Sequence, residues 1–356
     1  MIHFDENRLQ KVKHTHDLWW EGKLDRPLMK LAITDAHPLR ETRAPLLSQA
    51  NCTDFSYSPD EIVDATDAHL GRFEFLGDSF PSMDFTCFGP GVLAAFCGAE
   101  IRNETGGVWF FPKEELPIDK IRIEYDPENI YVQRIKALYR AGIDRWGNGV
   151  LLGMPDLGGV LDVVATFVGS ESLLIDLYDA PEEVERLVAE TEAAWYAAYD
   201  DFSTVLQAAN MGHTDWDGIY SSKPSYVLQC DFCYMIGPEM FDRFVLPTIK
   251  RDCGRLHNTI FHLDGIGELP HLDSLLSIGD LNAVQWQYGT GSGPVKRWVD
   301  VYEKIINAGK LLQIIDNENE FNTARELIKR YGHRVYFSAY APSSLRDEMD
   351  KLLAIR

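Results

Sequence analysis

Residues 259–286 read TIFHLDGIGELPHLDSLLSIGDLNAVQW and contain one complete unit of the fold. The runs Thr259–Leu263 and Ala283–Trp286 are short and largely apolar, which is typical of buried strands. Between them, Leu269–Leu276 places its leucines at helical spacing. Two strands joined through a helix predict a parallel pair with a right-handed crossover.

The same alternation extends over most of the chain. Eight strand segments favour a closed (β/α)₈ barrel, an α/β fold, with residues 1–356 as a single domain. A G-x-G-x-x-G pattern follows none of the expected strands, which argues against a dinucleotide-binding sheet. We expect a helical extension over residues 1–25, a β-hairpin insertion at Ile101–Phe111 and a helix at Glu239–Cys253. The expected strands are Leu28–Ile33, Phe73–Phe75, Val150–Met154, Tyr226–Cys230, Thr259–Leu263, Ala283–Trp286, Leu311–Ile315 and Val335–Ala339.

The chain is acidic, because 34 Lys and Arg oppose 55 Asp and Glu, giving a formal net charge of −21. This charge argues against a nucleic-acid partner and against anionic membranes. No apolar stretch reaches the ~18 residues that span a bilayer, and the first residues lack the apolar core of a signal peptide. We therefore expect a cytoplasmic protein with free thiols at its six cysteines and a small-molecule substrate. A homodimer is a further expectation.

Polar side chains at the carboxyl ends of the expected strands are candidates for chemistry, because barrel active sites form there. His262 and Asp264 are two residues apart in an extended segment and point the same way. The carboxylate can orient the imidazole, which suits a general base or a metal ligand. A pair that only holds a loop in place is the structural alternative. Asp231 is a candidate acid or cation-binding group.

Amide, aromatic and phenol groups end the last three expected strands, and such a ring suits a small polar or planar ligand. Tyr340 is a candidate proton donor or orienting group, and core packing is the alternative for Trp286. Tyr220 belongs to an aromatic loop that we expect to cover the mouth as a lid or to form an interface. The candidate substrate-binding residues are Asp156, Tyr220, Gln285, Trp286, Tyr288, Gln313 and Asp316.

Cys230 and Cys233 form a C-x-x-C pair, a spacing that occurs in zinc and redox sites. A metal held by one of these thiols with His262 and Asp264 is one interpretation, and buried inert thiols are the other. Cys253 ends an expected helix of roughly 15 residues, or ~22 Å. We therefore expect Cys253 at the opposite end of the barrel from Cys230.

Three stretches resemble a known family. They are Glu171–Leu187 (ESLLIDLYDAPEEVERL), Ile236–Lys250 (IGPEMFDRFVLPTIK) and Phe261–Gly265 (FHLDG). They resemble the uroporphyrinogen decarboxylase family, which includes cobalamin-dependent methyltransferases that move methyl groups between corrinoid proteins and thiols. The resemblance implies a (β/α)₈ barrel, and it places Asp78 at the position of a carboxylate that contacts substrate in the decarboxylases.

The sequence departs from both branches of this family. The decarboxylases carry an Arg-rich loop after the first strand, whereas Ala32–Pro38 has no Arg, and a substrate with many carboxylates needs cationic partners. The methyltransferases bind zinc through His-x-Cys and a second Cys, whereas Asp264 follows His262 here and residues 337–342 contain no Cys. We therefore leave the metal unassigned, with zinc as an alternative.

The combined reading favours an enzyme acting on a small organic substrate by corrinoid-linked methyl transfer, with the corrinoid on a partner protein. His262 and Asp264 would be base or ligand, and Asp78 and Asp231 charge partners. One alternative is a decarboxylase acting on a tetrapyrrole of the uroporphyrinogen type. Another is a non-catalytic barrel that binds a ligand or a corrinoid.

Overall fold

A computed structural model describes residues 2–210, 212–289, 291–315 and 320–355, with only the backbone for residues 207–210. It is a mixed α/β protein built on a largely parallel seven-stranded sheet in the order β2-β1-β11-β10-β9-β8-β7. The strands are β1 (Leu28–Ile33), β2 (Glu74–Gly77), β3 (Ser82–Met83), β4 (Glu100–Arg102), β5 (Trp109–Phe111), β6 (Leu151–Leu152), β7 (Ser225–Leu228), β8 (Asn258–Asp264), β9 (Ala283–Gln287), β10 (Leu311–Ile315) and β11 (Val335–Ala341).

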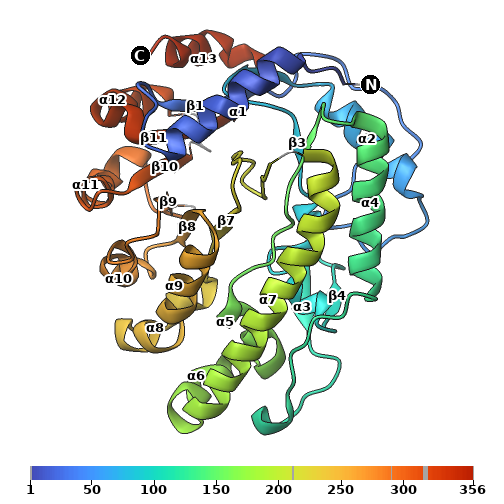
Figure 1. Cartoon of the computed structure of the whole chain (residues 1–356), viewed down its shortest axis with the longest axis vertical. Coiled ribbons are helices and arrows are strands. Elements are labelled where there is room, and N and C mark those ends of the chain that lie inside the picture. The colour runs from blue at the N-terminus through green and yellow to red at the C-terminus, as the bar shows by residue number, and fades with distance from the viewer. Residues whose placement is uncertain (1, 211, 290, 316–319, 356) are drawn as a thin grey trace.

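Helices surround the sheet, and α8 to α13 follow one another along its outer side in Figure 1. None of the helices in the described ranges is long and apolar enough to cross a membrane. The helices are α1 (Glu6–Trp20), α2 (Pro59–Leu70), α3 (Leu93–Phe96), α4 (Ile130–Trp146), α5 (Val160–Val168), α6 (Ser170–Asp179), α7 (Pro181–Asn210), α8 (Pro238–Phe244), α9 (Leu246–Arg255), α10 (Leu272–Leu276), α11 (Val299–Asn307), α12 (Phe321–Tyr331) and α13 (Arg346–Leu353).

Strands β7 to β11 and β1 are parallel, as the sequence predicts. The second expected strand differs, because β2 runs antiparallel to β1 with Glu74 opposite Ile33 and Gly77 opposite Lys30. After α2 the carbonyl of Arg72 accepts the N–H of His37, just beyond the carboxyl end of β1, so the chain then runs back along β1. Among the described strands β3 pairs only with β6, so strand pairing does not close one continuous barrel.

Residues 213–221, which we call the inner segment, lie between β6 and β7. The carbonyl of Thr214 accepts the N–H of Met154 at 2.8 Å. The Asp215 carboxylate accepts the N–H of Val227 at 2.9 Å, and the Trp216 indole donates to the carbonyl of Val227. The side chains of Asp215 and Trp216 thus form hydrogen bonds with the backbone of β7 at the edge where a neighbouring strand would pair in a closed barrel. The inner segment is the yellow stretch between α7 and β7 in Figure 1, and it is not the lid over the mouth that the sequence suggested.

One face of the sheet, which we call the inner face, carries an apolar layer near the amino ends of the strands. The indoles of Trp19 and Trp20 from α1 cover this layer together with Ile219 of the inner segment. The layer therefore closes the end opposite to the carboxyl ends of the strands. Its strand residues are Leu28, Val227, Ile260, Ala283, Leu311 and Tyr336.

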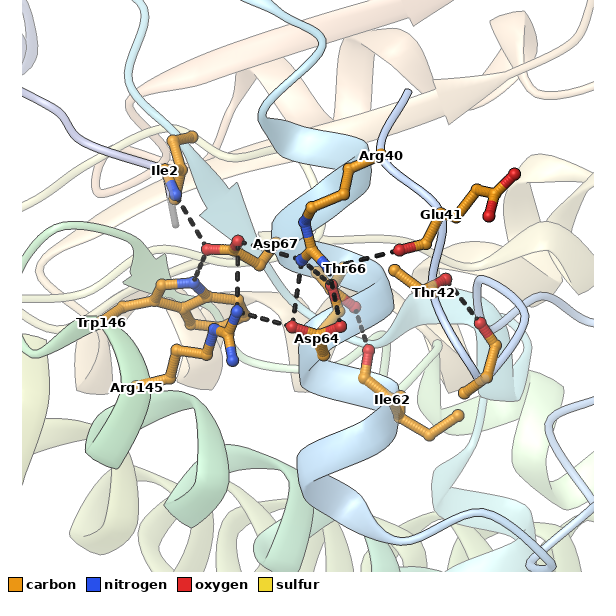
Figure 2. A network of polar contacts seen from close by, with 11 residues as sticks. Ile2, Arg40, Glu41, Thr42, Ile62, Asp64, Thr66, Asp67, Arg145 and Trp146 are labelled. Carbon is orange, nitrogen blue, oxygen red and sulfur yellow. Dashed lines mark hydrogen bonds and ion pairs between the residues drawn. The ribbon is translucent and has the colours of Figure 1, made fainter. Parts of the chain in front are cut away.

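A buried carboxylate joins the N-terminal residues to α2 and α4. Asp67 is 2% exposed and accepts the N–H of Ile2 at 2.9 Å and the indole N–H of Trp146 at 3.0 Å. Arg145 and Arg40 reach both Asp67 and its neighbour Asp64, as Figure 2 shows. This network anchors the start of the chain to the outer helices.

The remaining differences from the expected elements have local causes. The helix expected at Glu239–Cys253 is divided into α8 and α9 at Val245, because Pro247 has no N–H to continue the first helix. The expected hairpin is confirmed, with Ile101 of β4 opposite Phe110 of β5.

Candidate functional site

A polar layer follows the apolar layer on the inner face. Each of its residues lies two positions beyond an apolar one, which keeps its side chain on the same face of the strand. The inner segment brings Asp217 against this layer. The layer consists of Lys30 (β1), Ser338 (β11), Gln313 (β10), Gln285 (β9) and His262 (β8).

Asp217 is the centre of the hydrogen bonding in this layer. Its Oδ1 accepts the side-chain amides of Gln313 at 2.6 Å and Gln285 at 3.2 Å. The Oε1 of Gln285 contacts the Nδ1 of His262. Because a carboxylate only accepts hydrogen bonds, Asp217 orients the NH₂ of Gln285 toward itself and the carbonyl toward His262. The Nδ1 of His262 must therefore carry a proton, which leaves Nε2 as the reactive nitrogen.

The Nε2 of His262 faces Asp264, with 3.9 Å between this nitrogen and Oδ2. Burial alone would lower the pKa of His262, but the close Asp264 carboxylate, the hydrogen bond to Gln285 and the charge of Asp231 outweigh burial and raise it. The indole of Trp216 stands at right angles to the imidazole, with 5.3 Å between the ring centroids. His262 is thus held in one orientation and one tautomer, as acid–base catalysis requires.

We call the hydrogen-bonded series Asp217–Gln285–His262 the relay. A cavity of about 290 Å³ lies beside its Asp217 end. Lys30 lines it, is 4% exposed, and donates to the backbone carbonyl of Asp217. Burial would lower the pKa of Lys30, but Tyr340, Asp217 and Asp84 outweigh burial and raise it. Lys30 is therefore a charged ammonium inside the protein. The cavity lining is Lys30, Ser82, Asp84, Trp216, Asp217, Gly218, Ile315, Ser338, Ala339 and Tyr340.

Burial raises the pKa of several carboxyl groups near His262. Burial raises the pKa of Asp156 to about 7, and this group accepts the Gln229 amide at 3.0 Å. Burial also raises the pKa of Asp231, which interacts electrostatically with both His262 and Asp264. Burial next to Cys233 raises the pKa of Glu268 to about 11. The structure thus brings Asp156 and Asp231 into the electrostatic neighbourhood of His262, as the sequence suggested.

The residues present do not fit the zinc site of the resembled methyltransferases. Within the described ranges no three or more His, Cys, Asp or Glu side chains assemble as metal ligands. Cys230 and Cys233 are buried, and the hydrogen bond with the Cys233 thiol, together with burial, raises the pKa of Cys230 well above its usual value. Cys253 contacts Thr259 at the start of β8, away from Cys230, as expected.

Two sequence candidates lie at the other end of the strands. Asp78 forms a bidentate ion pair with Arg26, both contacts at 2.7 Å, and accepts the N–H of Met29 at the start of β1. Because β2 is antiparallel, the residue after it falls at the amino end of β1 and not at the mouth. Tyr220 donates its backbone N–H to His16 at 3.2 Å and therefore packs against α1.

Two aromatic candidates face the outer helices. Trp286 and Tyr288 pack on Trp298, with ring centroids 5.2 and 6.2 Å apart. Trp286 alternates with Gln285 along β9, so only the latter reaches the inner face. Tyr340 does line the cavity, whereas Asp316 lies outside the described residues.

Lys30, Asp84 and Asp217 are the site residues that the sequence analysis did not propose. Lys30 had a signal, since a single charge interrupts the apolar strand LMKLAI. Asp84 had no clear signal, because it follows a strand of only two residues. The role of Asp217 depends on where the inner segment lies.

Comparisons with known proteins give a fold but no family. No protein-family model matches the chain, and no curated protein matches it. Among solved structures, a methyltransferase from Methanosarcina mazei superposes with a TM-score of 0.61 at 11% sequence identity. The match covers 96% of this chain and 99% of that one, so the two share an overall fold from end to end.

Proposed function

We propose that the protein is an enzyme that removes a methyl group from a small organic substrate and passes it to a corrinoid on a partner protein. The observation that carries this proposal is the Asp217–Gln285–His262 relay beside a cavity that contains the buried Lys30 ammonium. The likeness of fold to a methyltransferase supports the same class of reaction.

The residues of this chain supply binding and proton transfer. At ~30 Å³ for each water-sized group, the cavity has room for roughly ten such groups, which suits a small substrate. Lys30 fixes an anionic group of the substrate by a charge-assisted hydrogen bond. His262 gives a proton from Nε2 to the heteroatom that loses the methyl group, and Asp264 stabilises the imidazolium.

The rim of the site suits a partner protein. Four large apolar side chains, each about half exposed, follow or end strands β7, β8 and β11, and exposed apolar groups mark interaction surfaces. These are Tyr234, Met235, Ile266 and Tyr340. A corrinoid presented there would supply the nucleophile that accepts the methyl group.

The test uses cob(I)alamin as the acceptor and a panel of small methylated amines, ethers and thioethers as donors. The absorbance change from cob(I)alamin to methylcobalamin reports transfer. We expect turnover with wild type and a loss of about 10²- to 10⁴-fold for His262→Gln, the range for an acid–base group. The control is His257→Gln, since His257 is an exposed side chain that contacts Lys223. Absence of transfer with every donor class, or equal rates in the two variants, would overturn the proposal.

A further inference from the structure

The cavity that Lys30 and Asp217 line contains a fixed positive and a fixed negative group. Lys30 Nζ donates to the Asp217 carbonyl and also interacts with the Tyr340 hydroxyl, whereas an ammonium can donate three hydrogen bonds. The Oδ2 of Asp217 is a buried atom without a hydrogen-bond partner. Both residues line the cavity. Each group therefore retains bonding capacity that a ligand can satisfy.

Glycine at position 218 keeps this arrangement open. Gly218 has a φ of +71°, and a Cβ added there would overlap Lys30 Nζ. The Lys30 ammonium consequently lies directly against the backbone of the inner segment. This close approach holds the positive charge of Lys30 beside the carboxylate of Asp217.

The walls of the cavity are aromatic and apolar. Tyr340 lies with its ring centroid 5.8 Å from Lys30 Nζ, and Trp216 and Ile315 complete the surface. Aromatic faces attract methyl groups attached to a cationic nitrogen. The cavity thus combines a cation, a carboxylate with a free oxygen and an apolar wall.

We infer that this cavity binds a small N-methylated amino acid, with its carboxylate on Lys30, its ammonium N–H on Asp217 Oδ2, and its methyl group against Trp216 and Tyr340. Such a ligand places its dipole antiparallel to that of the Lys30–Asp217 pair. A simple carboxylate would leave Asp217 Oδ2 unpaired, and a simple ammonium would leave the Lys30 donors unpaired. The inference rests on the proposed function only for the later fate of the methyl group.

Calorimetric titration of the wild-type protein, without corrinoid, tests the inference with three small ligands of related structure. N-methylglycine carries both charges, methoxyacetate replaces the ammonium by an ether oxygen, and N-ethylmethylammonium replaces the carboxylate by a methyl group. We expect N-methylglycine to bind at least about tenfold more tightly than either analogue, because each analogue loses one charged hydrogen bond.

Single variants assign each charge. Asp217→Asn should remove the preference for N-methylglycine over methoxyacetate, and Lys30→Met should remove the preference over N-ethylmethylammonium. Lys310→Met is the control, because Lys310 is another buried lysine, 7% exposed, that donates to the carbonyls of Ile278 and Leu281 outside the cavity.

Equal affinity for N-methylglycine and either analogue overturns the inference, and so does the absence of millimolar binding by all three. The wild-type comparison gives this answer even where a variant fails to fold. Binding of N-methylglycine without methyl transfer to cob(I)alamin would leave the inference standing and overturn the proposed function.

Discussion

In Gln285→Leu, the proton of a neutral His262 should no longer be confined to Nδ1. The substitution keeps a side chain of similar volume but removes the carbonyl that accepts the Nδ1 proton and the amide that donates to Asp217. Leaving a buried donor unpaired costs about 1–3 kcal/mol, equivalent to about 5- to 150-fold. We expect a fall in kcat/KM of this size, because Gln285 no longer fixes the orientation of the imidazole from which Nε2 transfers its proton.

The assay that decides the point is the ¹⁵N spectrum of the imidazole, which distinguishes a protonated Nδ1 from a protonated Nε2 without any turnover. A pH titration of the same signals should show the pKa of His262 falling in Gln285→Leu, because the Gln285 hydrogen bond raises it in wild type. Since the folded pKa is raised, His262 contributes stability that is present below about pH 6.5 and lost as the pH rises through the folded pKa. In Gln285→Leu this stability should be lost at a lower pH than in wild type, because the folded pKa of His262 is lower.

Gln313→Leu is the matched control. It removes the other amide that Asp217 accepts, at 2.6 Å, but does not touch His262. We expect the Nδ1–H tautomer to persist in this variant. The reasoning is refuted if both variants change the tautomer equally, or if neither changes it.

Three further outcomes follow from buried groups. Gly218→Ala should lower the free energy of unfolding in urea by at least about 1–3 kcal/mol, because the new Cβ meets the buried Lys30 ammonium and the backbone has a positive φ. The control Gly254→Ala has open space around it and should be neutral or stabilising. Asp67→Ala should cost about 3–5 kcal/mol and Asp64→Ala, which is partly exposed, about 1 kcal/mol or less. Burial opposes ionisation of Asp67, but hydrogen bonds to Ile2 and Trp146 outweigh burial and lower the pKa of this carboxyl group. The stability that Asp67 contributes is therefore present above about pH 3.8 and lost as the pH falls through the folded pKa. An acid-unfolding curve that is steeper for Asp67→Ala than for wild type would contradict this. The buried thiols of Cys52, Cys230 and Cys253, whose pKa values are raised, should resist a disulfide reagent at pH 8 until the protein is denatured. Rapid labelling of any of these three cysteines in the native protein would contradict their burial.

The strands were predictable because parallel strands are buried on both faces and form apolar runs such as Leu28–Ile33 and Val335–Ala341. The part of the site on β8, β9 and β10 was also predictable, because side chains alternate regularly between the two faces of a strand. A period of two along β8 places His262 and Asp264 together, and equivalent heights on β9 and β10 place Gln285 and Gln313 beside them.

The rest depended on contacts between distant segments. Asp217 reaches the polar layer only because Asp215 and Trp216 bond the edge of β7, and no local pattern signals such side-chain bonds. Asp78 follows a strand whose direction is set by the turn after α2. That direction places its carboxylate on Arg26 at the amino end of β1, and the resemblance alone could not reveal it.

β1 and β11 are neighbours in the sheet although they lie near opposite ends of the chain, and Ser343 bonds the carboxylate of Asp35 across 308 residues. During synthesis β1 therefore leaves the ribosome long before its partner exists, and one of its edges stays unpaired until the last strand emerges. Lys30 belongs to β1 and Ser338 to β11, so the cavity is assembled only when β11 pairs with β1. A chain truncated before β11 would expose an unpaired apolar edge, the kind of surface that chaperones bind and that aggregates form from.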